Sequence, residues 1–223
     1  MARMVIDGAF NDRKYGEAPV KIAWILKEAL DYGQKCQTYL LKDALEKKRL
    51  GNTWETMAYA AHAVINGWET GEFETWEEVP SVAGRVGEIL YSVALVNVNK
   101  KLNDAQNGYS CNHEICREYN DNAALIESQI KGFSPDIIVF GYPEELKCIV
   151  RDIFKRMTGE DYDIDEQFGT FAVTIRQNRL FIWAYHPGFY RSEEEGEFSK
   201  YKYFESFVKS VKFFKQKCNE LKK

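Results

Sequence analysis

The chain has 223 residues, of which 45% are hydrophobic and 29% are charged, a balance typical of a folded globular protein. Its formal net charge of −4 argues against a dedicated duplex-DNA binder, because basic residues that neutralise phosphates supply much of the affinity of such proteins. No apolar run approaches the ~20 residues of a transmembrane helix, and the first residues lack the apolar stretch of a signal peptide.

The five cysteines are odd in number and scattered in spacing, which indicates free thiols in a reducing compartment. We therefore expect a cytoplasmic protein with no membrane partner. Cys111 and Cys116 lie near His113, but their spacing fits no standard zinc pattern. Neither a metal nor another cofactor is expected.

The amino-terminal part of the chain predicts one strand followed by helices. A short apolar segment after Pro19 predicts a buried strand over residues 20–26. Helices are expected over 34–49 and 53–66. The aromatic and acidic segment 68–79 has the composition of a surface excursion, and it enters a predicted helix over 81–90.

The middle of the chain alternates between the two kinds of element. A strand is expected over residues 91–98, a helix over 114–131, a strand over 135–141 and a helix over 143–157. The strand over 135–141 ends in a glycine.

The carboxyl-terminal part predicts a β-hairpin and a long helix. Residues 171–175 and 180–185 flank a four-residue polar turn, and residues 199–221 place apolar side chains three and four apart along one face. The alternation of strands and helices predicts a single α/β domain over residues 1–223. We expect a three-layer α/β/α architecture around a central, mainly parallel sheet of four to five strands.

Ligands of such sheets bind beyond the carboxyl ends of the strands, and His186 lies at one of these ends. It follows an apolar and aromatic run and precedes Pro187, which biases the histidine toward an extended conformation. A rigid imidazole there is a good hydrogen-bond donor to a developing anion. From position alone, a histidine that merely caps the strand fits equally well.

Two other strand ends carry polar residues. Glu28 closes the first strand, where a carboxylate can orient a water or face a cation. An acid that pairs with Lys27 or lies at a helix start is the simpler interpretation. Asn97 ends the second strand and offers both a donor and an acceptor to a planar ring, or else is a strand-end turn residue. Of the other histidines, His62 has the setting of a structural side chain and His113 that of a solvated one.

Four segments, in order, resemble motifs of the uracil-DNA glycosylase superfamily. Lys-Ile-Ala-Trp-Ile-Leu-Lys-Glu-Ala-Leu at 21–30 resembles its first strand and water-activating motif, in the branch that reads Gly-Glu-Ala-Pro-Gly. Leu-Val-Asn-Val-Asn-Lys-Lys at 95–101 is similar to its base-reading strand. Residues 129–141 resemble the segment before its central helix, and Trp-Ala-Tyr-His-Pro-Gly at 183–188 resembles its Tyr-His-Pro-Ala motif.

The resemblance implies hydrolysis of the N-glycosidic bond of a flipped-out base, as in base excision repair. Glu28 would position water and face the oxocarbenium-like sugar, while His186 would donate to the base oxygen as negative charge grows there. Asn97 would read the base edge, and Tyr39 or Tyr32 would stack on the base.

The resemblance also implies partners. The substrate would be DNA, single- or double-stranded, or a nucleobase-bearing small molecule. Phosphate contacts are expected from Lys27, Lys100, Lys101 and Arg191.

The chain departs from the family pattern at several points. Lys27 replaces a glycine, Leu30 replaces a proline, and the iron–sulfur cysteines of the branch are absent. Four glutamates at 193–197 follow His186 and would repel phosphates, unless this run is only a solvated helix entrance capped by Ser192. Three interpretations stay open: a glycosylase for uracil or a related base in DNA, a base-binding protein with reduced catalysis, and a likeness of fold alone.

Overall fold

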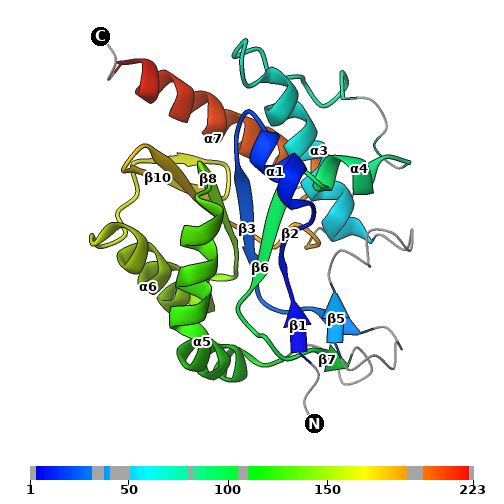
Figure 1. Ribbon diagram of the computed structural model, residues 1–223. Coiled ribbons are helices and arrows are strands. Elements are labelled where there is room, and N and C mark those ends of the chain that lie inside the picture. Colours follow the sequence, from blue (N-terminus) through cyan, green and yellow to red (C-terminus); the bar gives the residue numbers. More distant parts are fainter. Residues whose placement is uncertain are drawn as a thin grey trace.

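The computed structural model describes residues 4–31, 38–40, 51–79, 82, 84–104, 110–189 and 198–220. Its centre is formed by four strands that run in one direction. In spatial order these are β6 (Val93–Asn97), β3 (Ile22–Leu26), β8 (Ile137–Gly141) and β11 (Arg179–Ala184) (Figure 1).

Antiparallel strands extend this sheet at both edges. The short strand β2 (Gly8–Ala9) pairs with β6, while β10 (Phe171–Arg176) and β9 (Glu166–Phe168) follow β11 at the other edge. The expected α/β class and the parallel core are confirmed, but the sheet of the described residues has seven strands instead of four to five. Strands of two or three residues are too short to leave a periodic signal in the sequence.

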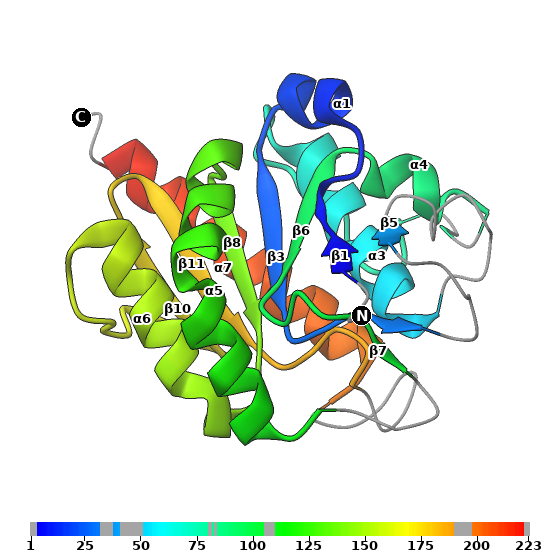
Figure 2. The same cartoon turned by 60° about the horizontal axis from the view of Figure 1, so that its bottom comes forward.

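Helices cover both faces of the sheet (Figures 1 and 2). The helices that pack on one face are α3 (Asn52–Gly67), α4 (Val86–Leu90) and α7 (Lys200–Glu220). The helices that pack on the other face are α5 (Asn112–Phe133) and α6 (Lys147–Thr158), the latter preceded by the 3-10 turn η2 (Glu144–Leu146). The small helix α1 (Asp12–Glu17) lies beside the amino ends of the strands.

The two cores meet on β3, whose five residues are all buried. Successive side chains of a strand point to opposite faces, so Trp24 enters the α3–α7 core and Ile25 the α5–α6 core. The Trp24 ring stacks on Phe207 of α7 with centroids 5.7 Å apart, and its indole N–H donates to Tyr203 Oη at 3.1 Å. This hydrogen bond satisfies a polar group in an otherwise apolar layer.

The predicted hairpin is confirmed. Gln177 and Asn178 connect β10 to β11 and adopt φ values of 51° and 57°. Two consecutive left-handed residues are typical of the type I′ turn, whose twist matches that of paired strands.

The predicted helix over 34–49 is wrong where it can be compared, because Thr38–Leu40 form strand β5, which pairs in parallel with β1 (Met4–Ile6). The rest of that range lies outside the described residues. A second small parallel pair joins β4 (Leu30–Asp31) to β7 (Asn103–Asp104). A short segment takes its conformation from a distant pairing partner, which local pattern does not reveal.

Segment 68–79 is also not the surface excursion that its acidity suggests. Phe73 and Val79 are buried, and Trp76 packs on Tyr59 of α3 with ring centroids 4.6 Å apart. The aromatic residues of this segment therefore complete the α3–α7 core. Most of its acids are exposed, but Glu74 Oε2 lies 3.5 Å from Nε2 of the buried His62. The helix expected over 81–90 shortens to α4.

None of the described helices combines the length and the apolar composition needed to cross a bilayer.

Replacement of Tyr203 by Phe tests the buried polar contact on β3. The Trp24 indole N–H then stays buried without its acceptor, so the free energy of unfolding in urea should fall by about 1–3 kcal/mol. The matched control is Tyr201→Phe on the same helix, which removes a hydroxyl near the surface and should change stability little. Equal losses in the two variants would contradict this account of the core.

Candidate functional site

The parallel strands bring four segments of the chain to one edge of the sheet. Glu28 lies two residues beyond β3, Asn97 ends β6, Gly141 ends β8 and His186 lies two residues beyond β11. Neighbouring strands are about 4.8 Å apart, so the ends of β3 and β11, with β8 between them, are separated by about 10 Å. The three strand ends singled out in the sequence therefore lie along one edge.

Gly141 keeps the middle of this edge free of a side chain. A Cβ atom at this position would lie 2.6 Å from Leu26 Cδ2 and 3.2 Å from Pro187 Cδ. The glycine thus permits the chain after β3 and the chain after β11 to approach each other across the end of β8.

The imidazole of His186 is fixed by its own loop. The backbone N–H of Gly188 donates to His186 Nδ1 at 3.1 Å. An accepting Nδ1 in a neutral imidazole places the proton on Nε2. Gly188 itself lies against the first turn of α3, where a Cβ atom would collide with Thr53 Oγ1.

The surroundings of His186 keep its ring neutral. Burial lowers the pKa of His186 from 6.5 to about 4, and the positive charge of Lys27 adds to the effect. Near neutral pH the ring is therefore an uncharged donor through Nε2. The influence of Lys27 also shows that the segment after β3 lies close to the end of β11.

Glu28 is oriented by the start of α5. Ser110, just before that helix, donates its backbone N–H to Glu28 Oε1 at 2.9 Å and its hydroxyl to Glu28 Oε2 at 2.6 Å. Lys27 Nζ donates to the Ser110 carbonyl at 3.2 Å. Ser110 therefore orients the acid, and both Glu28 and Lys27 contact that residue.

Asn97 is almost fully buried, with 1% of its surface exposed. Its backbone N–H donates to Asp7 Oδ2 at 2.5 Å, which fixes the main chain at the end of β6. Within the described part of the chain, Asn97 Nδ2 is buried without a hydrogen-bond acceptor. An unpaired buried donor is costly, so the side-chain amide of Asn97 is a candidate hydrogen-bond donor to a ligand.

Lys100 does not offer its ammonium group to a phosphate, which corrects the prediction made for it. The side chain is 7% exposed, and Nζ pairs with Asp7 at 2.8 and 3.0 Å. Burial lowers the pKa of Lys100, against the opposing effect of the Asp7 charge. Asp7 also accepts from Gln129 Nε2 at 3.2 Å, so the ion pair is embedded in a network under Asn97.

The remaining predicted contacts have mixed outcomes. Lys101 is half-exposed and pairs with the buried Glu118 at 2.5 Å, so its ammonium is already engaged. Tyr39 lies in β5, with its Cα opposite that of Val5. Tyr32 and Arg191 lie outside the described residues.

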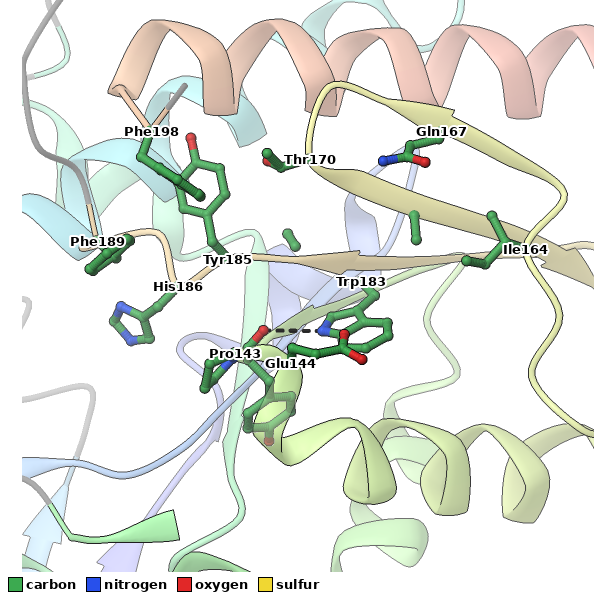
Figure 3. Close-up of a pocket in the computed structure, with 13 residues that line it drawn as sticks. Pro143, Glu144, Ile164, Gln167, Thr170, Trp183, Tyr185, His186, Phe189 and Phe198 are labelled. Atoms are coloured by element: carbon green, nitrogen blue, oxygen red, sulfur yellow. Dashed lines mark hydrogen bonds between the residues drawn. The ribbon is translucent and has the colours of Figure 1, made fainter. Parts of the chain in front are cut away.

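His186 also borders a pocket of about 570 Å³ on the far side of β11 (Figure 3). Its walls come from the segment after β8, the β9–β10 turn, β11 and the residues Phe189 and Phe198. Neither Glu28 nor Asn97 lines it. Figure 3 shows the imidazole pointing away from Trp183.

The sequence did not indicate Ser110 or Asp7. Ser110 contacts a residue 82 positions away, and Asp7 contacts residues 90 to 122 positions away. Both interactions depend on the sheet. The only local signal was the position of Ser110 beside a predicted helix start.

No three His, Cys, Asp or Glu side chains gather as a metal site in the described ranges. No protein-family model matches the chain, and no curated protein matches it.

The tautomer and charge of His186 are testable by NMR of the imidazole nitrogens. We expect a neutral ring protonated on Nε2 down to about pH 4. Because the folded pKa lies below the unfolded value of 6.5, the stabilisation from the neutral ring is complete above about pH 6.5 and is lost as pH falls toward 4.

Lys27→Met should raise the pKa of His186 while leaving it below 6.5, because burial is the larger cause of the shift. Lys21→Met, at the other end of β3, is the control and should leave the pKa unchanged. A wild-type ring that titrates near 6.5 would show that the pocket does not desolvate it.

Asp7→Asn tests whether Lys100 is structural. The variant leaves the ammonium buried without its counter-charge, so the free energy of unfolding should fall by about 3–5 kcal/mol. Addition of Lys100→Met should recover a large part of this loss, because the uncompensated charge is then removed. Glu17→Gln, at an exposed carboxylate, is the control, and an Asp7→Asn variant as stable as the control would contradict the assignment.

Proposed function

We propose that the chain is an N-glycosylase that hydrolyses the bond between a sugar and uracil, or a related base, in DNA. The observation that carries the proposal is His186: a neutral ring with its proton on Nε2, at the same sheet edge as Glu28 and Asn97. These three residues are the ones that match the glycosylase motifs, and they come from three separate strands.

The chemistry of these groups suits the reaction. As the bond between C1′ and the base nitrogen breaks, positive charge develops on the sugar and negative charge on the base oxygens. The Nε2–H of His186 can donate to such an oxygen without losing its proton, and a preorganised donor of this kind stabilises the developing anion. Asn97 Nδ2 can donate to the base edge.

Glu28 supports the other half of the reaction. The hydrogen bonds from Ser110 aim its carboxylate, which can orient water toward C1′ and take up a proton as the new C–O bond forms. Its negative charge also favours the cationic sugar. The departing base leaves with the electron pair of the broken bond and is later protonated by solvent.

A second candidate function is a base-binding protein with reduced catalysis. The observation that favours it is the engagement of both Glu28 oxygens by Ser110, which is also what a purely structural acid would show. Lys27 and Leu30, in place of the glycine and proline of the family motif, point the same way. Binding of a free base that is lost in Asn97→Ala, without base release by the wild type, would support this alternative.

The test of the enzymatic proposal is release of uracil from single- and double-stranded oligonucleotides. Glu28→Ala and His186→Ala should each lower the rate by about 10²–10⁴-fold, the range measured when a positioned acid, base or oxyanion donor is removed. Asn97→Ala should act mainly through weaker base binding.

His113→Ala is the matched control, because this histidine is exposed near the start of α5. It should retain the wild-type rate. If the wild type releases no base from any modified oligonucleotide tested, the enzymatic proposal fails.

A further inference from the structure

Several aromatic side chains from different segments line the pocket beside His186. We call it the aromatic pocket and define it by Trp183, Tyr185, Phe189 and Phe198, with Gln167 and Thr170 at its rim. In Figure 3 Tyr185 and Phe198 lie on one side of β11 and Trp183 lies on the other, with His186 and Phe189 beyond the end of the strand. The catalytic roles proposed above use none of them.

Three of the rings hold one another at fixed angles. Phe198 packs edge-to-face on Tyr185 at 5.1 Å and on Phe189 at 5.5 Å between centroids. The Trp183 indole donates to the Tyr142 carbonyl at 3.1 Å, which fixes its plane. Its neighbour across the hairpin is Ala172, whose small side chain leaves room beside the indole. Rigid rings beside an open space form a platform for another planar group.

The charge of the pocket excludes a phosphate. Among the described residues that line it there is no lysine or arginine, and burial keeps the His186 ring neutral. Glu144 at its border pairs with Lys147 at 2.9 Å. A neutral planar ring fits these walls, while the Thr170 hydroxyl and the Gln167 amide supply polar atoms for its edge.

The position of the pocket connects it to the reaction. His186 belongs both to the pocket and to the edge with Glu28 and Asn97, so a base held by the imidazole has its chain neighbour close to the aromatic rings. Successive bases of a single strand stack on aromatic side chains of binding proteins without sequence preference. In a duplex the neighbouring base is paired and cannot enter a pocket of this kind.

We propose that the aromatic pocket binds the nucleobase next to the one that is released, and that the substrate is therefore single-stranded. This inference rests on the proposed function, because it takes its orientation from a base held at His186. Phe189, which is 47% exposed, would be the outer wall against which the neighbouring base closes.

The test measures binding of fluorescein-labelled single-stranded pentathymidylate, which carries no uracil and so does not depend on catalysis. Phe189→Ala removes a wall and Ala172→Trp fills the space, and each should raise the Kd by about tenfold, the effect of losing one base–aromatic stack. Leu125→Trp adds an indole to an exposed site on α5 and should leave the Kd unchanged.

A second oligonucleotide of the same length, with abasic sites beside a central thymine, identifies the occupant. The wild type should bind the abasic strand as weakly as Phe189→Ala binds the intact strand. Phe189→Ala should bind the abasic strand no more weakly than the wild type does. If the wild type binds intact and abasic strands equally, a base does not occupy the pocket and the proposal is overturned, whether or not a peptide side chain can bind there. Equal affinity for the paired duplex would overturn it as well.

Uracil release from matched strands, intact and with abasic neighbours, in which uracil replaces the central thymine, separates the two proposals. If uracil is released but abasic neighbours do not weaken binding, the assignment of the pocket is wrong and the glycosylase proposal stands. If abasic neighbours weaken binding but no uracil is released, the glycosylase proposal is wrong and the pocket still binds a base of a single strand.

Discussion

The parallel pairing of β3 with both β6 and β8 places the carboxyl ends of these strands, and of β11 beyond them, along one edge of the sheet. Everything proposed for the site depends on this direction, because Glu28, Asn97 and His186 lie far apart in the chain. The pairing is stabilised from both sides, since β3 is buried between the α3–α7 and α5–α6 cores. Gly141 completes the arrangement by leaving the space at the end of β8 unfilled.

Charge at this edge is divided between two settings. Beneath Asn97, Asp7 and Lys100 neutralise each other in a buried pair that also fixes the backbone of β6. At the other end, burial and the nearby charge of Lys27 keep His186 neutral. The first setting gives rigidity, and the second gives an uncharged hydrogen-bond donor.

The sequence predicted the elements that carry strong local patterns. The apolar runs of the central strands, the polar turn of the β10–β11 hairpin and the one-sided apolar face of α7 each contain their own signal. The pairing of Thr38–Leu40 with Met4–Ile6 leaves no local signal in the sequence, because it joins segments more than thirty residues apart. Trp76 was misplaced for a related reason: its acidic neighbours suggested solvent, while α3 and α7 supply the apolar surface on which it packs.

In the candidate site, too, the sequence indicated what depends on local position but not what depends on long-range contacts. Position at a strand end was enough to single out Glu28, Asn97 and His186, because α/β sheets gather such ends. It was not enough to predict their partners. Lys100 resembles a phosphate-binding lysine in sequence, and only the fold brings Asp7 beside it. The neutral state of His186 likewise depends on burial, which no local pattern specifies.

The central claim is that one base is held by Asn97 and His186 while Glu28 faces its sugar. The most direct measurement is a crystal structure of Glu28→Ala bound to a short single strand with one uracil. The account predicts the uracil between Asn97 and His186, with a base oxygen within hydrogen-bond distance of His186 Nε2 and the Glu28 position opposite C1′. A uracil bound away from both residues, or side chains at 28, 97 and 186 that do not border a common cavity, would contradict it.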